Sequence, residues 1–236
     1  MITGTLPKFP AKLKQLLNIY VNLQKTENKF MNVLLINGSP NKNGCTYTAL
    51  SEVAGQLETQ GIKTRIFNIG KKAIQGCTAC ASCRKTGYCC TNDGVNECID
   101  LIKNADGVII GSPVYYASPN GALLAFLDRL FYAGSGKFAY KPAAAVVSCR
   151  RGGAATAFDV LNKYFTISNM PIVSSQYWNA VHGNTPEDVK QDLEGLQIMR
   201  TLGRNMAWLL KCIDQAKATV PYPEKEAERQ WTNFIR

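Results

Sequence analysis

The sequence predicts an α/β fold in which a five-stranded parallel sheet carries helices on both faces. Short apolar runs such as MNVLLIN (31–37) alternate along the chain with longer segments of helical periodicity. Continuous apolar strands are typical of parallel sheets, because both faces of such a sheet are buried. The chain has 236 residues, 46% hydrophobic and 19% charged. This composition excludes general disorder and fits one α/β domain or two small ones.

Five strands and five helices are expected to follow one another in strict alternation. The strands are predicted at 31–37, 62–68, 107–112, 143–148 and 171–177, and Pro113 is expected to end the third. Four helices are predicted over about 45–60, 120–132, 154–165 and 186–215. One more helix is expected to begin at a cap at Asp93 or a neighbour and to end at about 103. The cysteine-rich segment 77–90 has no clear period and is expected to be a loop.

Three parts are expected along the chain: an N-terminal extension (1–30), one domain (31–215) and a polar tail (216–236). Residues 1–30 contain five Lys and one Glu, and Met31 resembles a natural start. The extension could therefore precede the native chain, or it could be a packing helix, because Leu13, Leu16, Leu17 and Tyr20 share a helical face.

The charge and hydropathy pattern narrows the class of protein. The formal net charge of +10 suits anionic nucleotides as well as nucleic acid, but basic and aromatic residues do not interleave as nucleic-acid binding requires. No apolar run approaches the ~18 residues of a membrane helix, and Pro7, Lys8 and Pro10 interrupt any signal peptide. We expect a cytoplasmic protein without a nucleic-acid or membrane partner. The single histidine, His182, disfavours a His-rich metal site.

Three polar loops follow predicted strands, at 38–46, 112–118 and 149–153. In an open parallel sheet, ligands bind beyond the carboxyl ends of the strands, where the strand order reverses. An order of 2-1-3-4-5 would bring the loops of strands 1 and 3 together. The first loop, GSPNKNGCT, precedes a helix whose N-terminus attracts phosphate. Cys45 stands where a Walker A loop has Lys, so a monophosphate fits better than a triphosphate, and an ordinary strand–helix turn is the alternative.

The other two loops offer aromatic and cationic groups. Tyr115 and Tyr116 have flat faces that suit a planar heterocycle, or they could simply cover apolar surface. Arg150 and Arg151 could complement an anionic ligand or be solvated surface charges. The glycines that follow, in SCRRGG (148–153), would let the backbone approach a ligand closely.

Nine cysteines are many for this length, and five of them lie between 77 and 90. Cys77, Cys80, Cys83 and Cys89 have the spacing C-x2-C-x2-C-x5-C, which suits a [4Fe-4S] cluster, a structural zinc ion or redox-active thiols. The compact start favours iron–sulfur over zinc, and Cys90 is an extra thiol. The three cysteines in predicted elements, Cys98, Cys149 and Cys212, are expected to lie in the core.

Five segments in order, LLINGSPNKNGCT, GCTACASC, ADGVIIGSPVYY, FLDR and SCRRGG, carry a family resemblance over residues 31–215. The chain resembles the flavodoxin-like NADPH-dependent FMN reductases and iron–sulfur flavoproteins. The resemblance implies that the FMN phosphate is held by Ser39, Asn41, Asn43, Gly44, Cys45 and Thr46. It implies that the isoalloxazine is lined by Pro113, Val114, Tyr115 and Tyr116, and that its polar edge is approached by Ser148, Arg150, Arg151, Gly152 and Gly153. Cys45 departs from the Asn or Ser expected there, and a thiol is a poor donor.

These observations predict an FMN-dependent oxidoreductase that takes a hydride from NAD(P)H. Electrons would pass to a quinone-like compound or a redox protein, through a [4Fe-4S] cluster if the cysteines hold one. A non-catalytic flavodoxin-type electron carrier is the alternative, against which the basic charge counts. No acid–base residue is assigned, and the candidates for tuning the flavin are Tyr115, Tyr116, Arg150 and Arg151. The resemblance also implies a homodimer or homotetramer.

Overall fold

The structure is a computed structural model that describes residues 30–224, 230 and 232. It divides the chain into two units, Met1–Phe30 and Met31–Arg236. The expectation for residues 1–30 falls, except for Phe30, outside the described residues.

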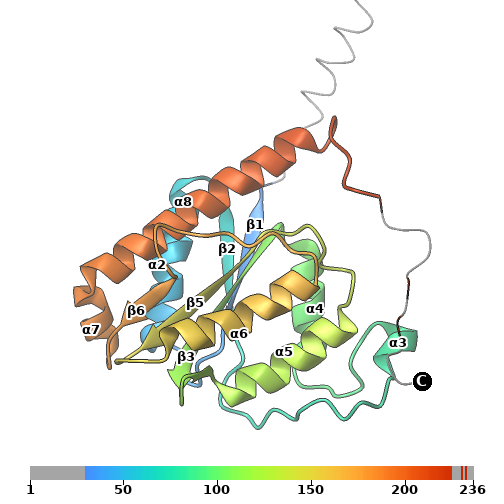
Figure 1. Cartoon of the computed structure of the whole chain (residues 1–236), viewed down its shortest axis with the longest axis horizontal. Coiled ribbons are helices and arrows are strands. Elements are labelled where there is room, and N and C mark those ends of the chain that lie inside the picture. The colour runs from blue at the N-terminus through green and yellow to red at the C-terminus, as the bar shows by residue number, and fades with distance from the viewer. Residues whose placement is uncertain (1–29, 225–229, 231, 233–236) are drawn as a thin grey trace, which may run out of the picture. The chain divides into compact units, whose positions relative to one another are not determined.

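The second unit contains a parallel sheet of five strands in the order β2-β1-β3-β5-β6 (Figure 1). The strands span Asn32–Asn37 (β1), Lys63–Asn68 (β2), Gly107–Tyr115 (β3), Ala143–Cys149 (β5) and Ala180–His182 (β6). Every pairing along this path is parallel. The predicted order 2-1-3-4-5 is therefore confirmed, and β1 and β3 flank the point where the order reverses.

Helices cover both faces of the sheet, and alternate residues of β1 show which helices cover which face. Val33 and Leu35 pack in one core with α2 (Cys45–Thr59) and α8 (Leu193–Ala216). Leu34 and Ile36 pack in a second core with α4 (Val95–Asn104), α5 (Gly121–Ala133) and α6 (Ala154–Ile167). Because successive side chains of a strand point to opposite faces, an unbroken apolar strand feeds two cores at once. The helix around Leu123 and Leu127 serves this second core.

The predicted fifth strand at 171–177 is wrong. That segment contributes only an isolated bridge between Ile172 and Ala143, and the strand beside β5 is Ala180–His182. Tyr177, the last residue of the predicted strand, and Trp178, which follows it, are more than half exposed. Val173 is the one buried residue of the segment 171–177, whereas Ala180 and Val181 are both buried and pair with β5.

Pro113 does not end β3. The strand continues to Tyr115, and Pro113 still pairs in register with Ser148 of β5. A tight hairpin then follows, in which β4 (Ser118–Pro119) runs antiparallel to the end of β3. Tyr116 and Ala117 form its two-residue turn, and both have positive φ (51° and 57°).

The long C-terminal helix predicted at 186–215 is broken at Asp192 into α7 (Pro186–Gln191) and α8. Asp192 adopts a non-helical ψ of 77°, and its carboxylate accepts from the N–H of Gly195. Because this carboxylate also accepts from the N–H of His182, it caps α8 and binds the end of β6 at once. Among the residues the structure describes, no helix has the length and apolarity to cross a bilayer.

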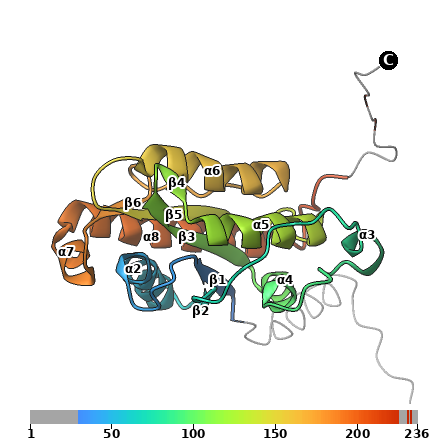
Figure 2. The same ribbon diagram turned by 90° about the horizontal axis from the view of Figure 1, so that it is seen from below.

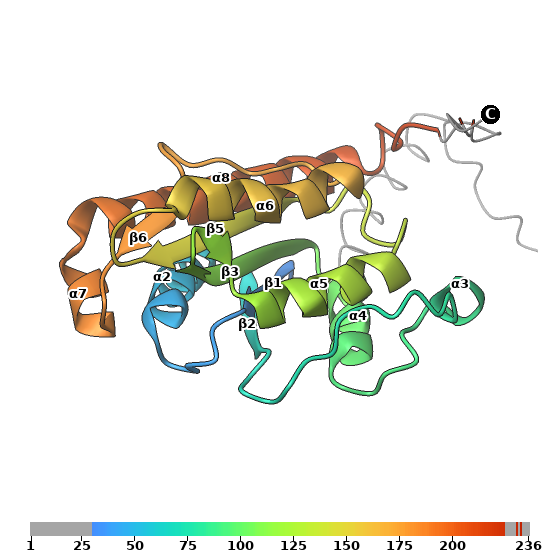
Figure 3. The ribbon, with the colours of Figure 1, turned by 60° about the horizontal axis from the view of Figure 1, so that its bottom comes forward.

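The remaining predictions for helices and loops differ less from the structure. Gly94, a neighbour of Asp93, is the N-cap residue of α4, in agreement with the predicted cap at Asp93 or a neighbour. The expected loop at 77–90 contains a one-turn helix, α3 (Cys83–Thr86), which lies beside the C-terminal end of α5 (Figure 2, Figure 3). Cys98 and Cys149 are buried as predicted, but Cys212 is exposed.

Candidate functional site

The carboxyl ends of β1 and β3 are joined by a short chain of hydrogen bonds. The N–H of Gly38 donates to the carbonyl of Gly111 at 2.8 Å, and the amide of Asn120 donates to the carbonyl of Gly38 at 2.7 Å. A Cβ on Gly38 would lie 2.8 Å from the Gly111 carbonyl oxygen, so only glycine allows this approach. The hydroxyl of Ser112 accepts from the N–H of Asn120, which in turn caps α5. The first two polar loops therefore start side by side.

Helix α2 begins in the first loop with an N-terminus that no side chain caps. Gly44 is its N-cap residue, and the first turn contains no acidic side chain. The first N–H groups of a helix have no partner within it, and together with the helix dipole they attract an anion. This end of α2 borders a cavity of about 260 Å³. The cavity therefore offers an anion site at the switch point of the sheet.

Two buried hydroxyls line the cavity. Thr46 in the first turn of α2 and Ser148 near the end of β5 are 1% and 4% exposed, and their hydroxyl oxygens are 2.8 Å apart. Ser39, which is 5% exposed, adds a third hydroxyl that accepts from the N–H of Asn41. A hydroxyl that is a donor in one bond can accept in another, so this set can rearrange to donate to an anion.

The thiol of Cys45 is unsuited to binding an anion. Its Sγ lies 3.8 Å from the carbonyl oxygen of Gly183. Burial raises the pKa of the Cys45 thiol, and the charges of Asp188 and Glu187 add to this effect. The side chain therefore stays neutral, and an anion near Cys45 would be bound by its backbone N–H, as the sequence suggested.

The structure brings most of the predicted cofactor residues into this one cavity. Its lining includes Ser39, Asn41, Gly44, Cys45, Thr46, Pro113, Val114, Tyr115, Ser148 and Arg150. Five predicted residues lie elsewhere: Asn43 borders a neighbouring open hollow, Tyr116 is fully exposed, Arg151 and Gly153 line a second cavity, and Gly152 is the fifth. Gly152 is exposed and lines neither cavity.

Arg150 and Arg151, which the sequence could not tell apart, serve different cavities. Arg150 borders the cavity at the N-terminus of α2. Arg151 borders a cavity of about 310 Å³ at the edge of the sheet, together with Phe158, Trp178 and His182. Both arginines lie in the short connection between β5 and α6, whose last residue, Gly153, adopts a φ of 90°.

Sequence reasoning missed a fourth loop of the cavity. Gly183, Asn184 and Pro186 also line it, after the end of β6. The backbone N–H groups of Asn184 and Thr185 donate to the carboxylate of Asp188, both at 2.9 Å, and these bonds lower the pKa of that carboxyl. The run GNTP is a turn signal that would have indicated this loop had the fifth strand been placed at 180–182.

The cysteine segment forms a separate site at the C-terminal end of α5. A hollow of about 20 Å³ is bordered by Cys77, Cys80, Cys83, Cys89 and Cys90. The hollow shares no lining residue with the cavity at α2. Within the described part of the chain, no group of three or more Cys, His, Asp or Glu side chains is arranged to hold one metal ion.

A buried cation faces the cysteine hollow. Arg129 is 3% exposed, forms an ion pair with Asp93, and places Nη1 3.6 Å from the Sγ of Cys89. Its Nε is buried without a hydrogen-bond partner among the described residues. Burial opposes ionisation of Cys89, but hydrogen bonds from Thr91 and Arg129 outweigh it and lower the pKa of the thiol. The surroundings of Cys89 therefore favour a thiolate at this position.

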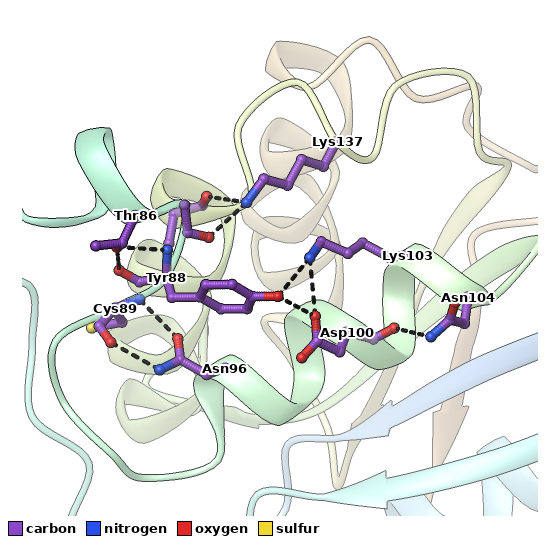
Figure 4. Close-up of polar contacts among 10 residues, drawn as sticks. Thr86, Tyr88, Cys89, Asn96, Asp100, Lys103, Asn104 and Lys137 are labelled. Atoms are coloured by element: carbon purple, nitrogen blue, oxygen red, sulfur yellow. Dashed lines mark hydrogen bonds and ion pairs between the residues drawn. The ribbon is translucent and has the colours of Figure 1, made fainter.

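The backbone at Cys89 is fixed to α4 (Figure 4). The side chain of Asn96 accepts from the N–H of Cys89 and donates to its carbonyl, both at 2.8 Å. The hydroxyl of Tyr88 donates to Asp100 and accepts from Lys103. This end of the cysteine segment is thus held by a folded helix, although its sequence has no secondary-structure period.

Two thiols of the hollow are in direct contact. The Sγ atoms of Cys80 and Cys90 are 3.5 Å apart, and both residues are exposed. The N–H of Ser82 and the thiol of Cys90 stabilise the Cys80 thiolate and lower its pKa, whereas the same contact raises the pKa of Cys90. The structure therefore pairs Cys80 with the extra cysteine rather than with another member of the predicted ligand set.

A doubly wound parallel sheet with an uncapped helix N-terminus at its switch point defines the class of nucleotide-phosphate-binding α/β proteins. A family model described as NADPH-dependent FMN reductase matches residues 31–185. The chain belongs to this family, whose members are flavin-dependent NAD(P)H oxidoreductases.

Individual relatives agree with the family. An iron–sulfur flavoprotein of Methanocaldococcus jannaschii is 32% identical over 78% of this chain and 99% of its own length. A second from the same organism is 32% identical over 74% of this chain and 94% of its own length. The solved structure of a flavodoxin, WrbA-like protein from Agrobacterium tumefaciens is similar with a TM-score of 0.55 at 15% identity, over 77% of this chain and 98% of that one. The flavodoxin-like fold is thereby established.

Proposed function

We propose that this chain binds FMN in the cavity at the N-terminus of α2 and uses it to carry electrons from NAD(P)H to a quinone-like compound or a redox protein. The observation that carries the proposal is the uncapped N-terminus of α2, which opens on a cavity lined by buried hydroxyls. A phosphomonoester fits this end of the helix, because its oxygens can accept from several N–H groups at once.

The residues present fit FMN in chemical type. Thr46, Ser39 and the first N–H groups of α2 would bind the phosphate, and Tyr115 and Val114 offer apolar surface for the ring. Arg150 would lie toward the polar edge of the ring and favour negative charge there. When bound, FMN supplies the capacity to accept a hydride and to release its electrons singly or in pairs. The protein would position it, and the buried hydroxyls of Ser39, Thr46 and Ser148 could donate to the phosphate in place of water.

We propose further that Cys77, Cys80, Cys83 and Cys89 hold a [4Fe-4S] cluster. Two observations support this: the thiols border one hollow, and the buried guanidinium of Arg129 also borders it, with Nη1 3.6 Å from the Sγ of Cys89. A cluster held by four thiolates is anionic, and a buried cation stabilises it. The names of the relatives from M. jannaschii point the same way. About four iron and four sulfide per chain after anaerobic purification would support the cluster, and one zinc without iron would contradict it.

The assembly proposed is a homodimer or homotetramer. Tyr177, Trp178 and Trp208 are each more than half exposed, and aromatic side chains are enriched where protein surfaces meet. Light scattering on the protein as it elutes from a size-exclusion column gives the mass of the assembly directly. A mass equal to that of one chain would contradict a dimer or tetramer.

Binding of FMN is tested with a valine substitution in the first turn of α2. Thr46→Val removes a hydroxyl that would donate to a charged acceptor, which is worth about 1.5–3 kcal/mol, so the Kd for FMN should rise about tenfold or more. Thr46→Ser keeps the hydroxyl and should restore affinity. Quenching of FMN fluorescence measures the Kd.

The matched control is Thr48→Val. Thr48 lies in the same helix and donates to the carbonyl of Gly44, but it does not line the cavity. It should leave the Kd nearly unchanged. Equal Kd values for Thr46→Val and the unmodified chain would mean that the phosphate is bound elsewhere.

A further inference from the structure

The contact between Cys80 and Cys90 sets this pair apart from the other thiols of the cysteine segment. Their Sγ atoms are 3.5 Å apart, which is van der Waals contact, and a disulfide needs them to approach to about 2.05 Å. A change of this size is within the reach of side-chain rotation and a small movement of an exposed loop. Both residues are exposed, so a small molecule can reach either sulfur.

The local backbone holds the two thiols near each other. The short helix α3 ends at Gly87, whose φ of 72° turns the chain back. Cys89 is then fixed to α4 through Asn96, so the residue that follows it starts from a fixed point. Only ten residues separate the two cysteines in sequence, so closing this loop costs little entropy.

The other cysteines are less suited to pair with Cys80. The Sγ of Cys89 faces the guanidinium of Arg129, and the residue is only partly exposed. Cys83 is also partly exposed and lies on the helix α3. Cys98 is fully buried in α4. Cys77 is exposed and borders the same hollow, but Cys90, which lies outside the C-x2-C-x2-C-x5-C spacing, is the cysteine whose Sγ contacts that of Cys80.

We propose that Cys80 and Cys90 are a thiol–disulfide exchange site, and that low-molecular-weight disulfides such as glutathione disulfide are its oxidants. The thiol of Cys80 loses its proton to water, and its sulfur attacks one sulfur of the small disulfide. The S–S bond of that disulfide breaks, and its other sulfur leaves as a thiolate that takes a proton from water. The thiol of Cys90 then loses its proton to water, its sulfur attacks the Cys80 sulfur of the mixed disulfide, and the second small thiolate leaves and takes a proton from water in the same way. In total, two protein thiols are oxidised to one disulfide and one small disulfide is reduced to two thiols.

The exchange has a consequence for the metal site, and this consequence alone rests on the proposed function. Cys80 is one of the four proposed cluster ligands, and a sulfur in a disulfide cannot bind iron as a thiolate. Cluster and disulfide therefore exclude each other. Oxidation would keep the site free of metal, and reduction by excess thiol would restore the ligand set.

The test uses the full chain equilibrated anaerobically in glutathione buffers of graded redox ratio. Each sample is quenched with acid, free thiols are alkylated, and peptides are identified by mass spectrometry, while iron is measured in parallel. The expected product is a peptide pair linked through Cys80 and Cys90. In Cys90→Ser, Cys80 should instead accumulate as the mixed disulfide with glutathione, at least about tenfold above its level in the unmodified chain.

Cys89→Ser is the matched control, because it removes the neighbouring thiol and leaves the contact pair in place. Because Cys89 is also a proposed cluster ligand, the comparison is made on iron-free samples, in which this variant should form the Cys80–Cys90 link at the same glutathione ratio as the unmodified chain. A dominant link from Cys80 to Cys77 or Cys83, or the absence of any link to Cys90 at oxidising ratios, would overturn the proposal. Failure of the cluster proposal has a different signature, since the link would then form without iron being present at any ratio.

Discussion

Gly153, at the start of α6, lies close against the hairpin beside the cavity, and replacing it with alanine tests that contact. Its φ is 90°, a conformation that costs an L-residue about 1–2 kcal/mol. A Cβ there would also lie 2.7 Å from the Cα of Ala117, which is backbone and cannot rotate away. Relief of such an overlap costs about 1–3 kcal/mol. Gly153→Ala should therefore lower the free energy of unfolding by about 2–5 kcal/mol.

Gly152→Ala is the matched control, because no atom lies within 4 Å of its ideal Cβ and its φ is not positive. It should change the free energy of unfolding by no more than about 0.5 kcal/mol. Urea denaturation of the flavin-free chain measures both variants. Because Ala117 belongs to the hairpin that follows Tyr115, Gly153→Ala should also weaken FMN binding. Equal stability of the two variants would refute the predicted contact between α6 and the hairpin.

Three further outcomes are expected. Arg150→Gln should lower the two-electron potential of bound FMN by tens of millivolts, where ~30 mV corresponds to ~1.4 kcal/mol. Arg151→Gln should leave the potential unchanged, because of the two arginines only Arg150 borders the cavity. Equal shifts for the two variants in spectroelectrochemistry would contradict this assignment. Arg129→Gln should cost about 3–5 kcal/mol of stability in urea, since it leaves Asp93 without its partner, and a loss below ~1 kcal/mol would mean that the ion pair contributes little. The pKa of Asp188 is lowered in the fold, so its contribution to stability is present above the unfolded-state pKa and is lost as pH falls through the lower folded value. Asp188→Asn should therefore reduce the drop in urea midpoint between neutral and acid pH, and an unchanged drop would contradict the role of this carboxylate.

The sequence by itself determined four of the five parallel strands, β1, β2, β3 and β5. Runs such as VLLI in β1 and VIIG in β3 are apolar without alternation, and only a strand buried on both faces requires that pattern. Together with the helices between them, these strands fix a doubly wound order. They also place the polar loops at one edge, so most residues of the cavity could be named in advance.

The sequence could not determine features that depend on a partner far along the chain. The edge strand Ala180–His182 is only three residues long, and its pairing with β5, not its composition, makes it a strand. Asp192 breaks a helix that is continuous in its apolar pattern, because its carboxylate binds the backbone of β6. Both features were predicted wrongly for this reason.

For the arginines and cysteines, too, the sequence shows only how the residues are spaced, and the folded structure shows what each side chain contacts. The spacing of the cysteines indicates thiolate chemistry, but only the folded loop shows that Cys80 touches Cys90 and that Arg129 faces Cys89. Two adjacent arginines look equivalent in sequence, whereas in the folded chain Arg150 and Arg151 border different cavities. Hydrophobic periodicity is a local property that a sequence carries directly, while the direction of a polar side chain is decided by the surfaces that pack around it.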